Sequence, residues 1–389
     1  MTTPRMRVTH VITRLIVGGA QENTAYSVLG LKDKPDLQVD LISGLSGGPE
    51  GSLESRFANY PGMLRVLPEL VRPIRPWQDW RALGALREIF RRERPDIVHT
   101  HSGKAGVLGR LAASRAGIPI IVHTIHGPSF GPFQGAAANF LFRQAEQKAA
   151  KVTTHFVTVA DAMKRQYLAA GIGRPEQYTR VFSGFNLEPF LSASNDPALR
   201  AHYGLAPEDI VVGKIARLVP LKGHDDLFAV APALVKQCRA IKFLLVGDGE
   251  WRERFEAQAR NLGLERSFVF TGLVPPEAVA GLVGIMDLVV HLSSREGLAR
   301  ALPQALAAAR PIIAYDCDGA AEVCLENQTG FLVDRGDLET LKKKILELAG
   351  DPALRGRFGR HGRQFVRERF PVQRMVDDLH ALYHKLAGS

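Results

Sequence analysis

The sequence predicts an α/β protein made of two doubly wound domains, and two observations lead to this prediction. Short runs rich in Val, Ile and Thr, bounded by Gly, Pro or Asp, alternate along the chain with longer helical stretches. Such alternation is typical of parallel sheets covered by helices on both faces. The length of 389 residues suits two domains. No apolar run is long enough to span a bilayer, so we do not expect an integral membrane protein.

The first half of the chain is predicted to form one sheet with its helices. The strands are expected at residues 8–13, 39–43, 97–100, 120–124 and 156–159. The helices are expected between them, at residues 21–31, 77–92, 104–116, 136–149 and 162–170.

The second half repeats this rhythm. Its strands are expected at residues 211–215, 243–246, 268–271, 288–292, 312–315 and 331–333. A stretch rich in Asn, Pro, Ser and Gly at 184–207 reads as a linker, so we place the domains at 1–187 and 188–389. The last helix, at about 371–387, is amphipathic, and we expect it to pack back toward the first domain.

Charge and cysteine content narrow the function classes. Residues 1–187 hold 24 Lys and Arg against 14 Asp and Glu, so the whole net charge of +10 lies in the first half. A basic surface of this kind faces anionic lipid, an anionic substrate or nucleic acid, or is simply solvated. Nucleic acid is not expected, because no helix-turn-helix, RNP or zinc signature is present. Three cysteines without a CxxC pair favour a reducing compartment.

Two clusters in the second half carry the strongest chemical signal. Arg217 and Lys222 lie five residues apart, after a predicted strand and before a glycine-opened helix. Two fixed cations in such a position suit a diphosphate, since arginine binds it as a fork and lysine as a point charge. Glu296 follows a later strand, and we expect a helix to begin beside it, with the amides of Gly297 and Leu298 available to an anion.

Weaker signals lie in the first half. Gly18 and Gly19 follow the first strand, where they let backbone amides approach an anionic ligand; a tight strand-to-helix turn explains them equally well. Lys104 opens a helix and is expected either to meet a phosphate or to be an ordinary loop lysine. His99 and His101 lack a cysteine or carboxylate at ligand spacing, so no metal site is predicted.

Taken in order, these motifs resemble the retaining glycosyltransferases of family 4, which have the GT-B fold. The resemblance covers nearly the whole chain. It implies two Rossmann-like domains facing each other across a cleft, with the acceptor side in residues 1–187 and nucleotide-sugar binding in residues 188–389. It rests on Gly18-Gly19, His123-Thr124-Ile125-His126-Gly127, Ala216-Arg217-Leu218 with Lys222-Gly223, Gly247-Asp248-Gly249, Gly272-Leu273-Val274 and the Glu296 segment.

The resemblance implies a role for each matched residue. Arg217 and Lys222 are expected to bind the donor diphosphate and to stabilise it as it leaves. His126 and Glu296 are expected to contact the donor sugar. Family members generally need no catalytic metal, because the Arg and Lys replace it, so no cofactor is expected. Further donor contacts are expected at Gly18, Gly19, Val274, Gly297 and Leu298.

The sequence departs from the family pattern at one position. The pattern has two glutamates separated by seven residues, and the partner position of Glu296 holds Gln304. This position usually binds the nucleotide ribose, which a neutral amide can still do through its oxygen and two N–H donors. The lost charge leaves a non-catalytic nucleotide-sugar or polysaccharide binder as one alternative. Glu322, in a loop that resembles the family's loop near the donor sugar, is expected to contact a ligand or to begin a helix.

The resemblance therefore implies a retaining glycosyltransferase in the assembly of a cell-surface polysaccharide or glycolipid. Its expected partners are a nucleotide-sugar donor and a sugar or lipid-linked acceptor. Its expected location is cytoplasmic and peripheral at the inner membrane face, with the basic first half against anionic lipid. Another enzyme on the same fold, such as a sugar-nucleotide epimerase or a soluble-sugar synthase, is the second alternative.

Overall fold

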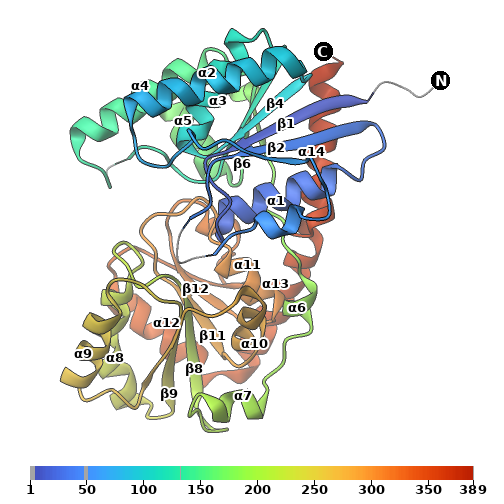
Figure 1. The fold of residues 1–389 in the computed structure, drawn as a ribbon. Coiled ribbons are helices and arrows are strands. Elements are labelled where there is room, and N and C mark those ends of the chain that lie inside the picture. Colours follow the sequence, from blue (N-terminus) through green and yellow to red (C-terminus); the bar gives the residue numbers. More distant parts are fainter. Residues whose placement is uncertain (1–4, 48–50, 132, 389) are drawn as a thin grey trace. The chain divides into compact units, whose positions relative to one another are not determined.

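The computed structural model describes residues 5–47, 51–131 and 133–388. The chain divides into two compact units (Figure 1). Unit 1 comprises Met1–Phe185 and Val372–Ser389, and unit 2 comprises Asn186–Pro371. The chain thus leaves unit 1, builds all of unit 2 and returns to unit 1 with its last helix. The division expected at 187/188 lies next to the one in the structure.

Unit 1 is built on a parallel sheet, with the strand order β3-β2-β1-β4-β5-β6-β7 in its described residues. The strands are β1 (Met6–Ile12), β2 (Leu37–Ser43), β3 (Leu64–Val66), β4 (Ile97–His101), β5 (Ile120–Ile125), β6 (His155–Thr158) and β7 (Tyr178–Arg180). The helices are α1 (Gly19–Leu31), α2 (Pro76–Glu93), α3 (Gly103–Arg115), α4 (Ala136–Ala150), α5 (Asp161–Ala169) and α14 (Val372–Ala387), with 3₁₀ turns η1 (Glu54–Phe57) and η2 (Pro175–Gln177).

Unit 2 has a second parallel sheet, in the order β10-β9-β8-β11-β12-β13. The strands are β8 (Ile210–Ile215), β9 (Ile241–Val246), β10 (Phe268–Gly272), β11 (Leu288–His291), β12 (Ile312–Tyr315) and β13 (Gly330–Val333). The helices are α6 (Glu188–Leu191), α7 (Pro197–His202), α8 (His224–Gln237), α9 (Arg252–Asn261), α10 (Val279–Gly284), α11 (Ala301–Ala307), α12 (Leu338–Gly350) and α13 (Pro352–Arg369), with 3₁₀ turns η3 (Pro276–Ala278) and η4 (Ala320–Glu322).

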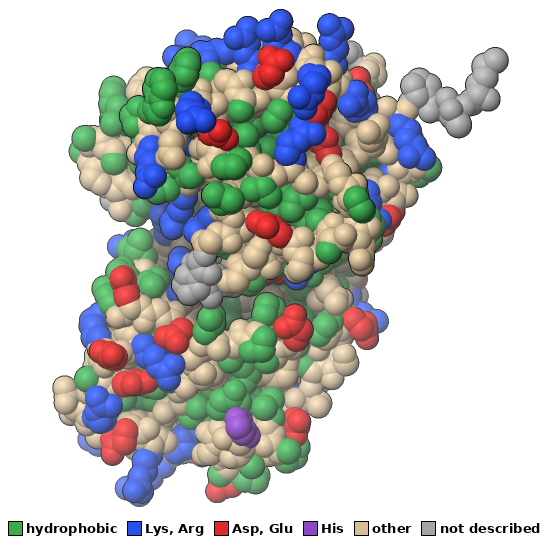
Figure 2. All heavy atoms as spheres, in the orientation of Figure 1, with side chains coloured by type: hydrophobic (Ala, Val, Ile, Leu, Met, Phe, Trp, Pro, Cys, Tyr) green, Lys and Arg blue, Asp and Glu red, His purple; other side chains and the backbone are tan. Residues whose placement is uncertain are grey.

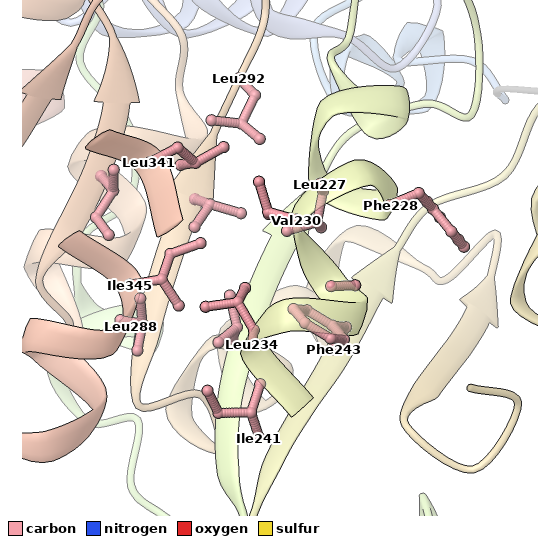
Figure 3. Close-up of a cluster of buried hydrophobic side chains, with 14 of the residues drawn as sticks. Leu227, Phe228, Val230, Leu234, Ile241, Phe243, Leu288, Leu292, Leu341 and Ile345 are labelled. Carbon is pink, nitrogen blue, oxygen red and sulfur yellow. The ribbon is translucent and has the colours of Figure 1, made fainter. Parts of the chain in front are cut away.

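Helices cover the sheet of unit 2 and bury its apolar strands. In the core shown in Figure 3, Leu234 of α8 and Ile345 of α12 pack with Phe243 of β9 and Leu288 of β11. All four side chains are completely buried. The strands β11 and β12 are buried along their whole length, which explains why all of their residues except His291 are apolar. The α/β prediction of two doubly wound units is therefore confirmed.

Short elements are where the structure differs from the predicted pattern. The edge strands β3 and β7 were not predicted, because three residues with little burial carry no clear apolar signal. The predicted linker contains the two short helices α6 and α7. Helix α7 has a local cause, since the Asp196 carboxylate accepts hydrogen bonds from the backbone N–H groups of Ala198 and Leu199, and Pro197 occupies the first turn.

Helix α14 packs on α1 within unit 1. Its apolar face includes Val376, Leu379 and Tyr383, all buried in the core of this unit. A Cβ on Gly30 of α1 would lie 2.3 Å from Cγ2 of Val376, so only glycine allows the two helices this close an approach. In the described residues, no helix is both long and apolar enough to cross a membrane.

In both parallel sheets, the order in which successive strands are added reverses at a central pair of strands. The reversal lies between β1 and β4 in unit 1, and between β8 and β11 in unit 2. In open parallel sheets, ligands bind outside the carboxyl ends of the strands at such a point. Each unit therefore presents one candidate ligand position, and the predicted site residues follow these strands.

Candidate active site

The loop after β8 holds Lys222 in a fixed turn. Its neighbours Leu221 (φ 68°) and Gly223 (φ 65°) both have left-handed backbone. A Cβ on Gly223 would lie 2.0 Å from the backbone oxygen of Leu292, so glycine is required there. The backbone N–H of Ser294 donates a 2.9 Å hydrogen bond to the carbonyl of Leu221. The loop after β8 is thus attached to the loop after β11.

This attachment brings Lys222 to Glu296, and the two side chains form an ion pair. The backbone N–H of Glu296 donates a 2.7 Å hydrogen bond to the Asp318 carboxylate, which follows β12. Nε2 of His291 lies 3.8 Å from Oε1 of Glu296. Desolvation raises the pKa of Glu296, but the Lys222 ammonium and His291 outweigh it and leave the pKa below its usual range. The carboxylate is therefore held in its ionised form.

Lys214, inside β8, is a buried cation that the sequence analysis did not identify. Its side chain is 1% exposed, and no described group accepts a hydrogen bond from its Nζ. Burial, together with the nearby Lys222 ammonium, lowers the pKa of Lys214 to about 7. An anionic ligand would supply the missing partner. A lysine in the middle of a run of Val and Ile is the signal that could have identified it.

The remaining residues predicted in unit 2 surround this cluster less closely. Arg217 is exposed in the loop after β8, and Gln304 is half-buried in α11. Val274 follows β10, which is the edge strand and is separated from β8 by β9. The structure therefore brings Lys222 and Glu296 into contact, and places Arg217 in the same loop as Lys222.

The helix expected beside the glutamate begins later than predicted. Helix α11 starts at Ala301, so Gly297 and Leu298 lie in the preceding loop and their amides are not in the first turn of a helix. The carbonyl of Gly297 instead accepts a 3.1 Å hydrogen bond from the backbone N–H of Gly319, which ties the loop to the segment after β12. Glu322 lies in η4 of that segment.

In unit 1, the glycine pair marks the start of α1. Gly18 is the N-cap residue, and its φ of 168° is extended backbone that any residue adopts. A Cβ on Gly18 would meet Oε1 of Gln21 at 2.9 Å, but that atom ends a flexible side chain that can move aside. Gly19 is the first helical residue.

A pocket of about 660 Å³ opens at the carboxyl ends of β1 and β4. Lys104, near the start of α3, lines it, and its ammonium is paired with the Asp79 carboxylate of α2. Lys104 is therefore neutralised by a neighbour rather than being an ordinary solvated loop lysine. The apolar part of the lining comes from Ile74, Val107, Leu108, Leu141 and Phe142.

His126 follows β5 and begins a chain of hydrogen bonds through the interior of unit 1. Its Nε2 lies 3.1 Å from Nδ1 of His101, whose Nε2 lies 2.9 Å from Nδ1 of His10. The Tyr383 hydroxyl of α14 lies 3.3 Å from the remaining nitrogen of His10. Burial lowers the pKa of His10 and of His126 to about 3, so these imidazoles are neutral at physiological pH.

The chain continues from the Tyr383 hydroxyl to His99 at 2.6 Å, and from His99 to the Thr124 hydroxyl at 2.6 Å. A neutral imidazole has one N–H and one bare nitrogen, and a hydroxyl has one hydrogen. The hydrogen bonds among His126, His101 and His10 must therefore run in the same direction, and they end at a hydroxyl that either donates to His10 or accepts from it. The tautomer that His126 presents at Nδ1 is thereby coupled to Tyr383 in α14, a residue that the sequence analysis did not select.

Two family models match the chain, one in each unit. The model described as "Glycosyl transferase 4-like domain" matches residues 18–183, and the model described as "Glycosyl transferases group 1" matches residues 195–365. The first match contains Gly18 and His126, and the second contains Arg217, Lys222 and Glu296.

Curated relatives match over most of their own length. A UDP-Gal:alpha-D-GlcNAc-diphosphoundecaprenol alpha-1,3-galactosyltransferase of Escherichia coli is 25% identical over 387 residues, which is 98% of this chain and 97% of the relative. The capsular polysaccharide biosynthesis glycosyltransferase CapM of Staphylococcus aureus is 24% identical and covers 90% of each chain. Among solved structures, Anabaena Alr3699/HepE in complex with UDP-glucose is 22% identical, with a TM-score of 0.80 over 98% of this chain and 100% of that one. That structural similarity shows the shared fold.

Proposed function

The chain belongs to the GT-B glycosyltransferases of family 4, and from this premise we propose that it transfers a sugar from a nucleotide-diphosphate donor to an acceptor hydroxyl with retention of configuration. The cluster of Lys214, Lys222 and Glu296 at the carboxyl ends of β8 and β11 is the observation that supports the proposal most. The named glycosyltransferase relatives disfavour the alternatives of a non-catalytic binder and of a different enzyme on this fold.

The proposed chemistry follows from the charges of this cluster. A donor diphosphate competes with Glu296 for the Lys222 ammonium, and it also gives the buried Lys214 an anionic partner. When the bond between the sugar carbon and the diphosphate oxygen breaks, negative charge grows on the leaving phosphate. The positive charges of Lys222 and Arg217 stabilise that charge. The released Glu296 carboxylate then accepts hydrogen bonds from sugar hydroxyls.

The first donor to test is a UDP-sugar, because the Escherichia coli relative is named for UDP-Gal and the Anabaena structure holds UDP-glucose. We expect UDP to raise the melting temperature. At ~100 times its dissociation constant, bound UDP adds about 2.7 kcal/mol to the free energy of unfolding. GDP and ADP with their sugars are the comparison ligands. If only GDP or only ADP raises the melting temperature, the donor nucleotide in the proposal changes from uridine to guanosine or adenosine. If no nucleotide raises it, the proposed sugar transfer is contradicted.

Variants separate the diphosphate role from a loss of structure. Lys222→Ala and Arg217→Ala are expected to lower kcat about 100-fold or more, as removal of one charge-stabilising donor does elsewhere. The matched control is Lys236→Ala, which removes an exposed lysine from the far end of α8. Normal turnover in both site variants would contradict the proposal. We expect turnover to persist in EDTA, since the two cations supply the charge that a metal would bring.

The pocket of unit 1 is the proposed acceptor position. It combines apolar walls with charged groups, since Arg14 and Arg72 line it beside Glu146 and the ion pair of Lys104 with Asp79. A hydrophobic chain carrying phosphate, such as a lipid-linked sugar, matches that mixture. The relative from Escherichia coli is named for a diphosphoundecaprenol acceptor, which supports this class. We expect Leu141→Asp to raise KM for a lipid-linked acceptor and to leave donor binding unchanged.

We further propose that unit 1 rests on the anionic inner face of a membrane, with the protein on its cytoplasmic side. The apolar side chains Ile74, Trp77, Trp80 and Leu141 are each 65–68% exposed, and Ile74 and Leu141 also line the pocket. Figure 2 shows Lys and Arg side chains among hydrophobic ones over the visible part of unit 1. Exposed Trp beside basic residues suits the interface of an anionic bilayer.

A further inference from the structure

Three side chains from distant parts of the sequence meet at the surface of unit 1. His380 and His384 lie one turn apart on the same face of α14, and Asp36 lies in the turn before β2. Asp36 and His380 are 344 positions apart in the sequence. The opposite face of α14 is buried in the core of the unit, so the two imidazoles are held in place by packing.

The ligand atoms of these side chains are close enough to share one ion. Oδ2 of Asp36 lies 2.9 Å from Nε2 of His380 and 2.6 Å from Nε2 of His384. The two Nε2 atoms lie 3.1 Å apart. Zinc bonds of about 2.0–2.2 Å place neighbouring ligand atoms of a tetrahedral site roughly 3.3 Å apart. The measured separations are within a few tenths of an ångström of that value, apart from the shorter one to His384.

Hydrogen bonds alone do not satisfy this arrangement. If both Nε2 atoms carry hydrogens and donate to Asp36, the two N–H groups crowd each other at 3.1 Å. If one Nε2 is bare, its lone pair faces a carboxylate oxygen. A cation removes the conflict, because both nitrogens can then direct lone pairs at it while Asp36 supplies negative charge.

We infer that Asp36, His380 and His384 bind one divalent transition-metal ion, with zinc as the ion that fits best, and that this ion fastens α14 to unit 1. The ligand set of two imidazoles and one carboxylate suits zinc. The His384 side chain is 51% exposed, which leaves room for water as the fourth ligand. The nearby Lys34 is already paired with Asp377, which limits its repulsion of an ion. This structural site departs from the expectation of no metal, and the i, i+4 spacing of the two histidines is the missed signal.

The test uses the full chain after treatment with EDTA and removal of the chelator. Titration with ZnCl₂ is followed by isothermal calorimetry and by melting temperature, and titration with CoCl₂ by its visible absorption, which reports ligand type and geometry. We expect one zinc ion per chain and a rise of about 5 °C or more in melting temperature at ~100 times the dissociation constant. His384→Ala and Asp36→Asn should weaken zinc binding tenfold or more and abolish that rise.

The matched control is His361→Ala, which removes an exposed imidazole from α13 of unit 2 and should keep full zinc affinity. The EDTA-treated variants should melt cooperatively, which shows that they fold. Equal zinc affinity in the wild type and His384→Ala would overturn the inference, as would a wild-type chain that binds no zinc. A rise in melting temperature shared by all variants would assign the ion to another site and overturn it as well.

Discussion

Among single residues, Lys214 shows how a binding site can oppose stability. Its ammonium is buried without a partner among the described residues, and its pKa of about 7 lies below the ordinary value of 10.5. Between pH 7 and 10.5 the unfolded chain binds a proton that the folded chain does not. The free energy of unfolding therefore rises with pH in this window, and the penalty for burying the charge is complete below pH 7.

We expect Lys214→Met to stabilise the ligand-free protein at pH 7 by about 1–4 kcal/mol, because methionine fills similar space without a charge. The same change should remove the rise of stability with pH and weaken donor binding. Melting temperatures from pH 7 to 10, with and without UDP, measure all three effects. Lys236→Met is the control, since it changes an exposed lysine. A variant less stable than the wild type at pH 7 would show that Lys214 has a partner in solution.

Gln304 is the residue at which the chain departs from the family pattern. It is half-buried in α11, where its amide can bond a ribose hydroxyl as a carboxylate does. We expect Gln304→Glu to leave kcat/KM unchanged or to raise it. Any such change corresponds to at most about 1–3 kcal/mol in transition-state free energy. Steady-state kinetics with the identified donor measures this effect. Complete loss of activity would show that the amide N–H donors are themselves required.

At the level of elements, α14 carries chemistry as well as packing. Its Tyr383 hydroxyl joins His99 to the run of three histidines, His10, His101 and His126, that ends at His126. Tyr383→Phe should leave His10 and His99 each without one hydrogen-bond partner, at about 1–3 kcal/mol of stability. We also expect a loss in kcat, because the tautomer of His126 is no longer fixed by the chain.

Tyr178→Phe is the matched control for this prediction. The Tyr178 hydroxyl is buried in the same unit and donates a 2.7 Å hydrogen bond to the carbonyl of Ile172, away from the histidine chain. Both variants should lose similar stability, and only Tyr383→Phe should change kcat and the ¹⁵N chemical shifts of the His126 ring. Equal kcat values in the two variants would show that Tyr383 of α14 does not influence catalysis through His126.

For the whole molecule, the excess of positive charge in residues 1–187 leads to a prediction about membrane binding. The excess of Lys and Arg in residues 1–187 lies in the same unit as the exposed Trp77 and Trp80, whose rings stack at 5.1 Å. We expect the Trp77→Ser/Trp80→Ser variant to lose binding to anionic vesicles, since both apolar side chains are removed from the interface. Sedimentation with anionic and with neutral vesicles, at low and high salt, measures the binding.

The control for vesicle binding is Leu262→Ser, which removes an exposed apolar side chain from unit 2. It should sediment with anionic vesicles like the wild type. If the wild type binds neutral and anionic vesicles equally well, its basic residues do not contribute to membrane binding. Absence of binding by the wild type would contradict the membrane proposal and would leave the sugar-transfer proposal standing.

The sequence by itself determined the two doubly wound units and most of their strands, because a strand buried on both faces is mostly apolar. It also selected Lys222 and Glu296, because each lies in a segment that follows a predicted strand, where parallel sheets bind ligands. Only the tertiary structure decided the start of α11, the buried position of Lys214, the histidine chain to Tyr383 and the meeting of Asp36 with His380 and His384. These features depend on contacts between residues far apart in the sequence, and local patterns do not encode such contacts.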